Sequence, residues 1–175
     1  VEVLVGNVER TGNTKECVFV RILPDAISID DVYGGASTAN PNIHGVFAIL
    51  SACHAAAAAV ALALMNRAST CQLPISIRPA ELLDEDLALI SQPIEIGEAV
   101  LAGGGAVANG FLLGLSTFDV FGRLHVVDPK KVTPGILNRC AWFQADDLGH
   151  SKSERLVMRA REYFPGLDLV PHELT

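Results

Sequence analysis

Apolar positions in the second half of the chain fall into segments that alternate between strand length and helix length. The strand-length segments span 98–102, 123–128 and 167–171. The helix-length segments span 106–118 and 151–164. Because strands that alternate with helices form right-handed crossover units, this half predicts a mainly parallel sheet with helices packed on it.

Shorter apolar runs, bounded by turn residues, mark the first part of the chain. They predict strands at Val1–Val5, Cys17–Leu23 and Ala26–Asp30, with a further strand at Leu73–Arg78. Together with one long apolar segment between the third and fourth runs, this pattern predicts a small α+β region.

That long segment is rich in alanine and predicts a helix over residues 42–67, with Asn40 as its N-cap and Pro41 at its first position. Its apolar run, Val46–Met65, is long enough to span a bilayer. Small side chains on every face favour instead a helix buried between other elements. His54 is then expected to be a core or boundary histidine and not a ligand.

The expected fold class is therefore α/β: a Rossmann-like, mainly parallel sheet flanked by helices, preceded by the small α+β region. The segment 79–93 is acidic and predicts a linker, which divides the chain into an N-terminal region, 1–96, and a nucleotide-binding part, 97–175. We interpret its row of carboxylates as a solvated face and not as metal ligands.

Composition narrows the possible partners. Half of the 175 residues are apolar, which is enough for a substantial core, and the formal net charge is −7. A negative chain disfavours general binding to nucleic acid or to an acidic membrane. The four cysteines are widely spaced without a C-x-x-C pair, so neither a zinc site nor a disulfide framework is indicated. With no signal-peptide pattern at Val1, we expect a cytoplasmic protein.

The candidate chemistry begins at a glycine run, Gly103–Gly105, which lies between a predicted strand and a predicted helix. Glycines let the backbone approach a phosphate closely, and the N–H groups of a helix start attract anions. Asp128 follows 25 residues after Gly103 at the end of the next strand, where a carboxylate can accept hydrogen bonds from ribose hydroxyls. The alternative for the glycine run is a plain tight turn without a ligand. The alternative for Asp128 is a turn residue at the end of a strand.

A basic residue near the start of the last helix adds to this picture. Ser151 and Glu154 form an S-x-x-E capping box, so Lys152 is expected in the first helical turn. A cation there opposes the helix dipole by about 0.3–1 kcal/mol, and a bound polyphosphate would reverse that sign. The alternative is a solvated surface lysine. Arg139 is a second basic candidate, and its alternative is a surface ion pair in a loop. Cys140 has no partner histidine at a spacing that would indicate a nucleophilic thiol.

Four blocks of the sequence resemble the ThiF/MoeB family, the adenylating domain shared with ubiquitin-activating enzymes. They are the glycine run, the strand that ends in Asp128, the segment V-T-P-G-I-L-N-R-C at 132–140 and the segment D-L-G-H-S-K-S-E at 147–154. The blocks stand in the family's order, and the resemblance covers residues 100–171.

This resemblance implies ATP-dependent adenylation of the C-terminal carboxylate of a ubiquitin-like or sulfur-carrier protein or of a peptide. By resemblance, Gly103 and Gly105 cradle phosphate and Asp128 binds ribose. Asn109 stands where the family has a small polar residue beside the loop.

The resemblance also assigns the catalytic cations and the partners. Arg139 and Lys152 match the basic residues that touch the triphosphate. The family pairs as dimers and uses Mg²⁺, and we expect its magnesium-binding aspartate downstream of Thr175, so that this chain is part of a larger adenylation domain.

Several positions depart from the family pattern. Lys130 stands where the family often has a second acid, Ile136 replaces an asparagine, and Cys140 replaces a glutamine. Two alternatives to adenylation stay open, and these changes favour the first. One is a non-catalytic scaffold of the same fold that binds a nucleotide or a partner protein. The other is a nicotinamide- or flavin-dependent oxidoreductase, which the glycine run alone would permit.

Overall fold

A computed structural model describes residues 1–6, 16–35, 44–64, 72–83 and 87–173. The chain forms two compact units, Val1–Leu87 and Ala88–Thr175. The division falls nine residues before the predicted boundary at 96/97, because β5 starts at Ile94, ahead of the predicted strand 98–102. The acidic segment holds a short helix, α2 (Pro79–Leu82), and a 3-10 helix, η1 (Leu87–Ser91).

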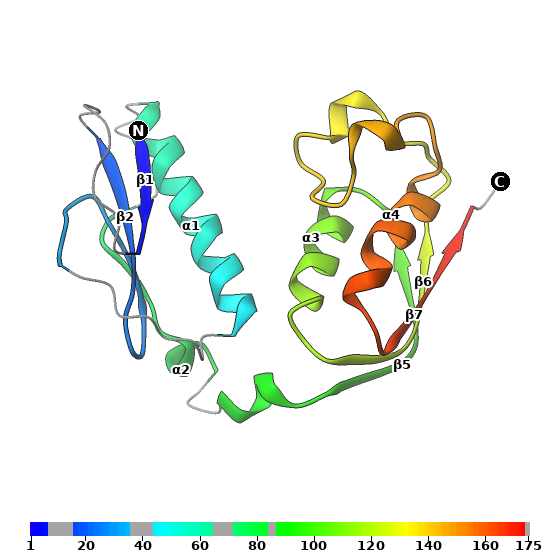
Figure 1. Cartoon of the computed structure of the whole chain (residues 1–175), viewed down its shortest axis with the longest axis horizontal. Coiled ribbons are helices and arrows are strands. Elements are labelled where there is room, and N and C mark those ends of the chain that lie inside the picture. Colours follow the sequence, from blue (N-terminus) through cyan, green and yellow to red (C-terminus); the bar gives the residue numbers. More distant parts are fainter. Residues whose placement is uncertain (7–15, 36–43, 65–71, 84–86, 174–175) are drawn as a thin grey trace. The chain divides into compact units, whose positions relative to one another are not determined.

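The first unit is a four-stranded sheet with one long helix, α1 (Gly45–Ala63), packed on it (Figure 1). The strands lie in the order β1-β2-β3-β4, of which only the β1–β2 pair is parallel. Their bounds are β1 Glu2–Val5, β2 Cys17–Ile22, β3 Ile27–Asp30 and β4 Ile75–Ile77. All four predicted strands are present, and the α+β expectation is confirmed.

The long helix differs from its prediction in two respects. Its N-cap is His44, whose Nδ1 accepts a hydrogen bond from the Val46 N–H (3.3 Å), while the predicted cap residues, Asn40 and Pro41, lie outside the described residues. The expectation of burial on all sides is also wrong. Only 22% of its apolar window is buried, although by length and composition it could cross a membrane. Its contacts run to β1, β2 and β3, so one face packs on the sheet.

The second unit is a β-α-β-α-β arrangement built on a three-stranded parallel sheet. Its order, β5-β6-β7, follows the sequence. Figure 1 shows both of its helices on the same side of the sheet, which follows when successive right-handed crossovers advance in one direction. The bounds are β5 Ile94–Ala102, α3 Ala106–Leu115, β6 Val120–Val127, α4 Lys152–Ala160 and β7 Leu167–His172. The α/β, Rossmann-like fold class is confirmed.

Alternation along the strands separates a core face from an open face. On β6, Leu124 and Val126 are buried beneath α3 and α4, where Leu112 and Leu156 are fully buried. On the other face, His125 links the three strands, because its Nε2 lies 2.9 Å from Glu98 Oε1 on β5 and its Nδ1 lies 2.8 Å from His172 Nε2 on β7. A polar chain thus crosses the face of the sheet that the two helices leave uncovered.

Glycines interrupt β5 and β6 where the two strands meet. The pairing register shifts between Glu95 and Glu98, and Gly97 adopts a positive φ of 62°. A side chain at Gly122 would place its Cβ 2.5 Å from the Gly97 carbonyl oxygen, so only glycine fits there. This bulge lies on β5, which is an edge strand of the sheet.

The long connection from β6 to α4 lies over the carboxyl ends of the strands (Figure 1). Hydrogen bonds from Val132 N to His150 O (2.8 Å) and from Gly149 N to Val132 O (3.0 Å) close it at its base. It contains the 3-10 helices η2 (Pro134–Ile136) and η3 (Ala145–Asp147). Its apolar side chains, which include Trp142 and Phe143, join the core and fix the loop against the helices.

Candidate functional site

The glycine run forms a tight turn between the end of β5 and the start of α3. Gly103 has a positive φ of 94°, which favours glycine, and its N–H donates to the Val127 carbonyl (2.7 Å). Gly105 is the N-cap of α3, and no side chain caps the N–H groups of the first turn. Val107 in that turn is 88% exposed, so the helix start is open to a ligand. This is the geometry of an anion site at a helix N-terminus.

Asp128 holds the turn from the neighbouring strand. Its side chain is buried, and its Oδ2 accepts a hydrogen bond from the Gly104 N–H (2.6 Å). Its Oδ1 accepts from the Lys130 N–H (2.7 Å). A carboxylate has about four acceptor positions, so two remain available for a ligand hydroxyl. Asp128 therefore shapes the turn and still has capacity to bind ribose.

Lys152 packs directly against the turn. A side chain at Gly104 would place its Cβ 3.3 Å from Lys152 Cβ and 3.4 Å from Asp128 Oδ2, which explains the glycine at that position. The predicted N-cap of α4 is confirmed, because Ser151 accepts a hydrogen bond from the Glu154 N–H (3.5 Å). Two residues that lie far apart in sequence from the glycine run thus converge on it.

The environment of the Lys152 side chain is unusual for a lysine. Lys152 is only 9% exposed, yet among the described residues its ammonium makes no hydrogen bond or ion pair. The ammonium nitrogen is not one of the buried unpartnered atoms of the described residues, so it reaches solvent and is free to meet an anionic ligand. The unpaired charge beside an uncapped helix start indicates a phosphate site.

Asn109 links the glycine turn to the long loop above it. Its amide nitrogen donates to the carbonyl oxygens of Gly104 (3.2 Å) and Gly105 (3.0 Å). Its side-chain oxygen accepts from the Trp142 N–H (3.0 Å), and its backbone carbonyl accepts from the Trp142 indole N–H (3.1 Å). Both amide N–H groups are therefore used within the protein, and the residue is only 1% exposed. Asn109 is placed to position the turn.

Replacing Asn109 with alanine is expected to lower the free energy of unfolding by about 2 kcal/mol, because the buried Trp142 N–H loses its acceptor. Urea denaturation measures this effect. Asn138→Ala, at an exposed asparagine of the same loop, is the matched control and should leave stability nearly unchanged. Equal stability of the two variants would contradict the positioning role.

Arg139 does not contact the glycine turn. Its side chain is exposed, and its Nη1 donates to the Gly135 carbonyl and lies 3.4 Å from Asn138 Oδ1. The structure therefore brings the glycines, Asn109, Asp128 and Lys152 together, while the Arg139 guanidinium is folded onto its own loop.

The neighbouring Cys140 lies inside the core. Burial raises the pKa of its thiol, and the nearby charges of Arg139 and Lys152 oppose that rise. Both cations thus lie near one thiol. Because the burial effect is the largest, Cys140 stays protonated at neutral pH and is a poor nucleophile.

Native-state alkylation tests this difference between thiols. With iodoacetamide at pH 8, the exposed Cys53 is expected to react at least about tenfold faster than Cys140, as followed by peptide mass spectrometry. In denaturant, where burial is lost, the two thiols should react at similar rates. Rapid native labelling of Cys140 would contradict a buried, protonated thiol.

A buried ion pair that the sequence did not reveal fixes the end of the loop. Asp147 is 0% exposed and accepts from the Gln144 N–H (2.9 Å) and from Arg159 Nε and Nη2 (both 3.2 Å). The exposed Asp146 shares the same guanidinium (2.6 Å), and this hydrogen bond holds the pKa of Asp146 below its usual value. This Asp147–Arg159 ion pair connects the loop to α4, the helix that also carries Lys152. Within the described ranges, no group of three His, Cys, Asp or Glu side chains could hold a metal ion.

Comparisons with known proteins give limited matches. No protein-family model and no curated protein sequence matches this chain. Among solved structures, the chain is similar to Escherichia coli MccB with ATP, at 21% identity and a TM-score of 0.42, over 46% of this chain and 23% of that chain. It is also similar to TcdA (CsdL), at 19% identity and a TM-score of 0.39, over 45% of this chain and 31% of that chain. The similar regions span less than a third of either structure.

Proposed function

We propose that the second unit binds ATP and uses it to adenylate the C-terminal carboxylate of a ubiquitin-like or sulfur-carrier protein or of a peptide. The observation that carries this proposal is Lys152, whose side chain packs against the glycine turn at the uncapped start of α3 while its ammonium, among the described residues, has no hydrogen-bond or ion-pair partner. A triphosphate supplies the negative charge that this arrangement lacks. The four sequence blocks supply the expectation of adenylation.

In this proposal the nucleotide lies across the carboxyl ends of β5 and β6. Gly103 and Gly105 approach the phosphates, Asp128 accepts hydrogen bonds from ribose, and Asn109 holds the turn in place. This location agrees with the general rule that ligands of open α/β sheets bind beyond the carboxyl ends of the strands.

The reaction forms one bond and breaks one bond at the α-phosphorus. A carboxylate oxygen of the acceptor attacks the α-phosphate, the bond to the β-phosphate oxygen breaks, and pyrophosphate leaves. Negative charge increases on the leaving group, and Lys152 is placed to stabilise it. Arg139 joins Lys152 if its exposed side chain releases the Gly135 carbonyl. Mg²⁺ accompanies ATP and is held largely by the phosphates, with few protein ligands.

Two further features belong to the same proposal. We place the protein in the cytoplasm, and the free thiols of Cys17, Cys53 and Cys140 suit a reducing compartment. We also propose a homodimer, which exposed apolar side chains on the first unit, such as Val60 and Leu64, support. Sedimentation velocity measures the oligomeric state.

The second candidate is a scaffold that keeps the fold but does not adenylate. Two observations favour it: the Arg139 guanidinium is bonded to its own loop, and Ile136, at the position of the family's asparagine, is buried in the core. A scaffold would still bind nucleotide at the glycine turn or would bind a partner protein there.

Pyrophosphate exchange separates the candidates. The protein is incubated with ATP, labelled pyrophosphate and candidate carrier tails that end in a free carboxylate. Adenylation predicts label in ATP only when a tail is present, and amidation of the tail should abolish it. Clear ATP binding without exchange would favour the scaffold. NAD binding without ATP binding would favour the oxidoreductase.

A further inference from the structure

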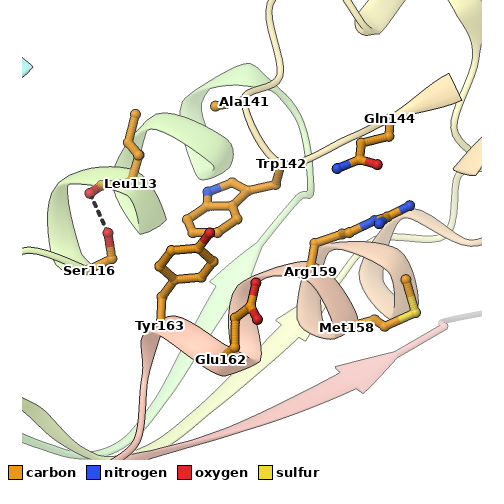
Figure 2. A pocket seen from close by; sticks show the side chains of 9 residues that line it. All are labelled: Leu113, Ser116, Ala141, Trp142, Gln144, Met158, Arg159, Glu162 and Tyr163. Atoms are coloured by element: carbon orange, nitrogen blue, oxygen red, sulfur yellow. Dashed lines mark hydrogen bonds between the residues drawn. The ribbon is translucent and has the colours of Figure 1, made fainter.

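A second cavity lies between α3 and α4, apart from the glycine turn and within the same unit. Its volume is about 510 Å³, which is within the range of small-molecule sites. Figure 2 shows Trp142 and Tyr163 in its centre, with Leu113 on one side and Met158 and Gln144 on the other.

The two aromatic rings form a rigid wall. Their centroids lie 5.0 Å apart at an interplanar angle of 72°, which is an edge-to-face contact. Trp142 is fixed further by the hydrogen bonds from its backbone N–H and indole N–H to Asn109. Rigid aromatic faces attract cations, and arginine is the cation found most often in such contacts.

Two charged side chains line the cavity, Arg159 and Glu162, and they differ in whether they are already paired. The side chain of Arg159 is occupied by Asp146 and Asp147, and Figure 2 shows it extending toward Gln144 and away from Tyr163. Glu162 also lines the cavity, is exposed, and within the described part of the chain makes no hydrogen bond or ion pair. A free carboxylate therefore lies in the same cavity as the two rings.

We propose that this cavity binds an arginine side chain of a peptide partner. The flat guanidinium packs on the exposed Tyr163 ring, beside the edge of the mostly buried Trp142, and pairs with the Glu162 carboxylate. Its aliphatic stem lies along Leu113 and Met158. Arginine suits the site better than lysine, because a planar guanidinium both stacks on a ring and bonds a carboxylate through two N–H groups.

The single tryptophan of the chain makes the test direct. Trp142 is the only tryptophan in the sequence, so tryptophan emission comes from a residue that lines this cavity. The probes are acetylated and amidated Gly-Arg-Gly, the same peptide with citrulline in place of arginine, and the same peptide with leucine. Titration of the whole chain with the arginine peptide is expected to change Trp142 emission saturably at millimolar concentrations, at least about tenfold tighter than with citrulline.

Variants assign the interaction to its residues. Glu162→Gln should weaken the arginine peptide by about five- to tenfold, while Glu154→Gln, at an exposed acid in the first turn of α4, should change it by less than about twofold. Tyr163→Leu should also weaken binding. Equal affinity for the arginine and citrulline peptides, or no saturable change, would overturn the proposal. Because Lys152→Ala should leave this binding intact, failure here and failure at the nucleotide site are distinguishable.

Discussion

Replacing Lys152 with alanine is expected to weaken ATP binding by about 10- to 100-fold, the loss of one charge-assisted hydrogen bond at about 1.5–3 kcal/mol. Adenosine binding should change by less than about twofold, because no phosphate is present to meet the ammonium. Isothermal titration calorimetry with ATP, AMP and adenosine measures the difference. The loss should grow with the number of phosphates.

Two controls keep this result specific. Lys130→Ala removes an exposed lysine side chain next to the site and should leave ATP affinity nearly unchanged, since only the Lys130 backbone N–H contacts Asp128. Lys152→Arg should retain part of the affinity. The melting temperature of Lys152→Ala should fall only slightly, because the substitution removes the packed aliphatic stem but no hydrogen bond or ion pair of the described residues. An equal loss of ATP and adenosine binding would show that Lys152 has only a structural role.

Replacing Asp147 with alanine is expected to lower the free energy of unfolding by about 3 kcal/mol. The substitution removes the buried acceptor of Arg159 and leaves the Gln144 N–H without its partner. Breaking a buried pair from one side is more damaging than losing an exposed pair. Urea denaturation measures this loss, and ATP affinity should fall with it because the loop is no longer tied to α4.

Asp146→Ala is the matched control, because this neighbouring residue bonds the same guanidinium with its side chain 69% exposed. Water and salt screen an exposed pair, so its loss should be much smaller. Asp147→Asn keeps an acceptor for the Gln144 N–H and should fall between the two. Similar stabilities for Asp146→Ala and Asp147→Ala would contradict the assignment of this connection to the buried carboxylate.

The sequence predicted which elements form better than where they begin. Strand and helix periodicity located every strand and α-helix that the structure describes in the second unit, but none of the 3-10 helices η1, η2 and η3. The strand predicted at 98–102 is longer in the structure, where β5 begins at Ile94. The prediction missed its first residues because the bulge at Gly97, between Glu95 and Glu98, interrupts the alternation of apolar and polar positions. Similarly, Gly122 interrupts the apolar pattern at the start of β6, so the prediction missed the first residues of that strand. Glycine is required at this position because the backbone of β6 passes close to Gly97 of β5.

The alanine-rich helix shows the opposite limitation. Small apolar side chains on all faces gave no asymmetry from which to assign a packed face, and uniform apolarity suggested burial throughout. In the structure the buried positions are Phe47, Ser51, Ala55 and Ala58, which lie on one face at helical spacing. Contacts with the sheet, not hydrophobicity alone, select that face.

The candidate site was predictable where its residues follow a local pattern. The glycine run, Asp128 and Lys152 stand at a strand end, a strand end and a helix start, and these positions meet at one edge of a parallel sheet. Asn109 and its partner Trp142 are 33 positions apart, and Asp147 and Arg159 are 12 apart. Such contacts depend on how the loop packs, which no spacing encodes.

The position of β5 at the sheet edge has a consequence for handling the protein. Within the second unit, its first half is guarded against intermolecular pairing by the bulge and by Glu95 and Glu98, whereas Ala99–Ala102 carries no charge. This unguarded stretch leads straight into the glycine turn. A second molecule that paired its backbone with Ala99–Ala102 would obstruct entry of the nucleotide. Concentrated preparations should therefore lose nucleotide-binding capacity before they precipitate. Val100→Lys, at a side chain that is 68% exposed, should prevent that loss.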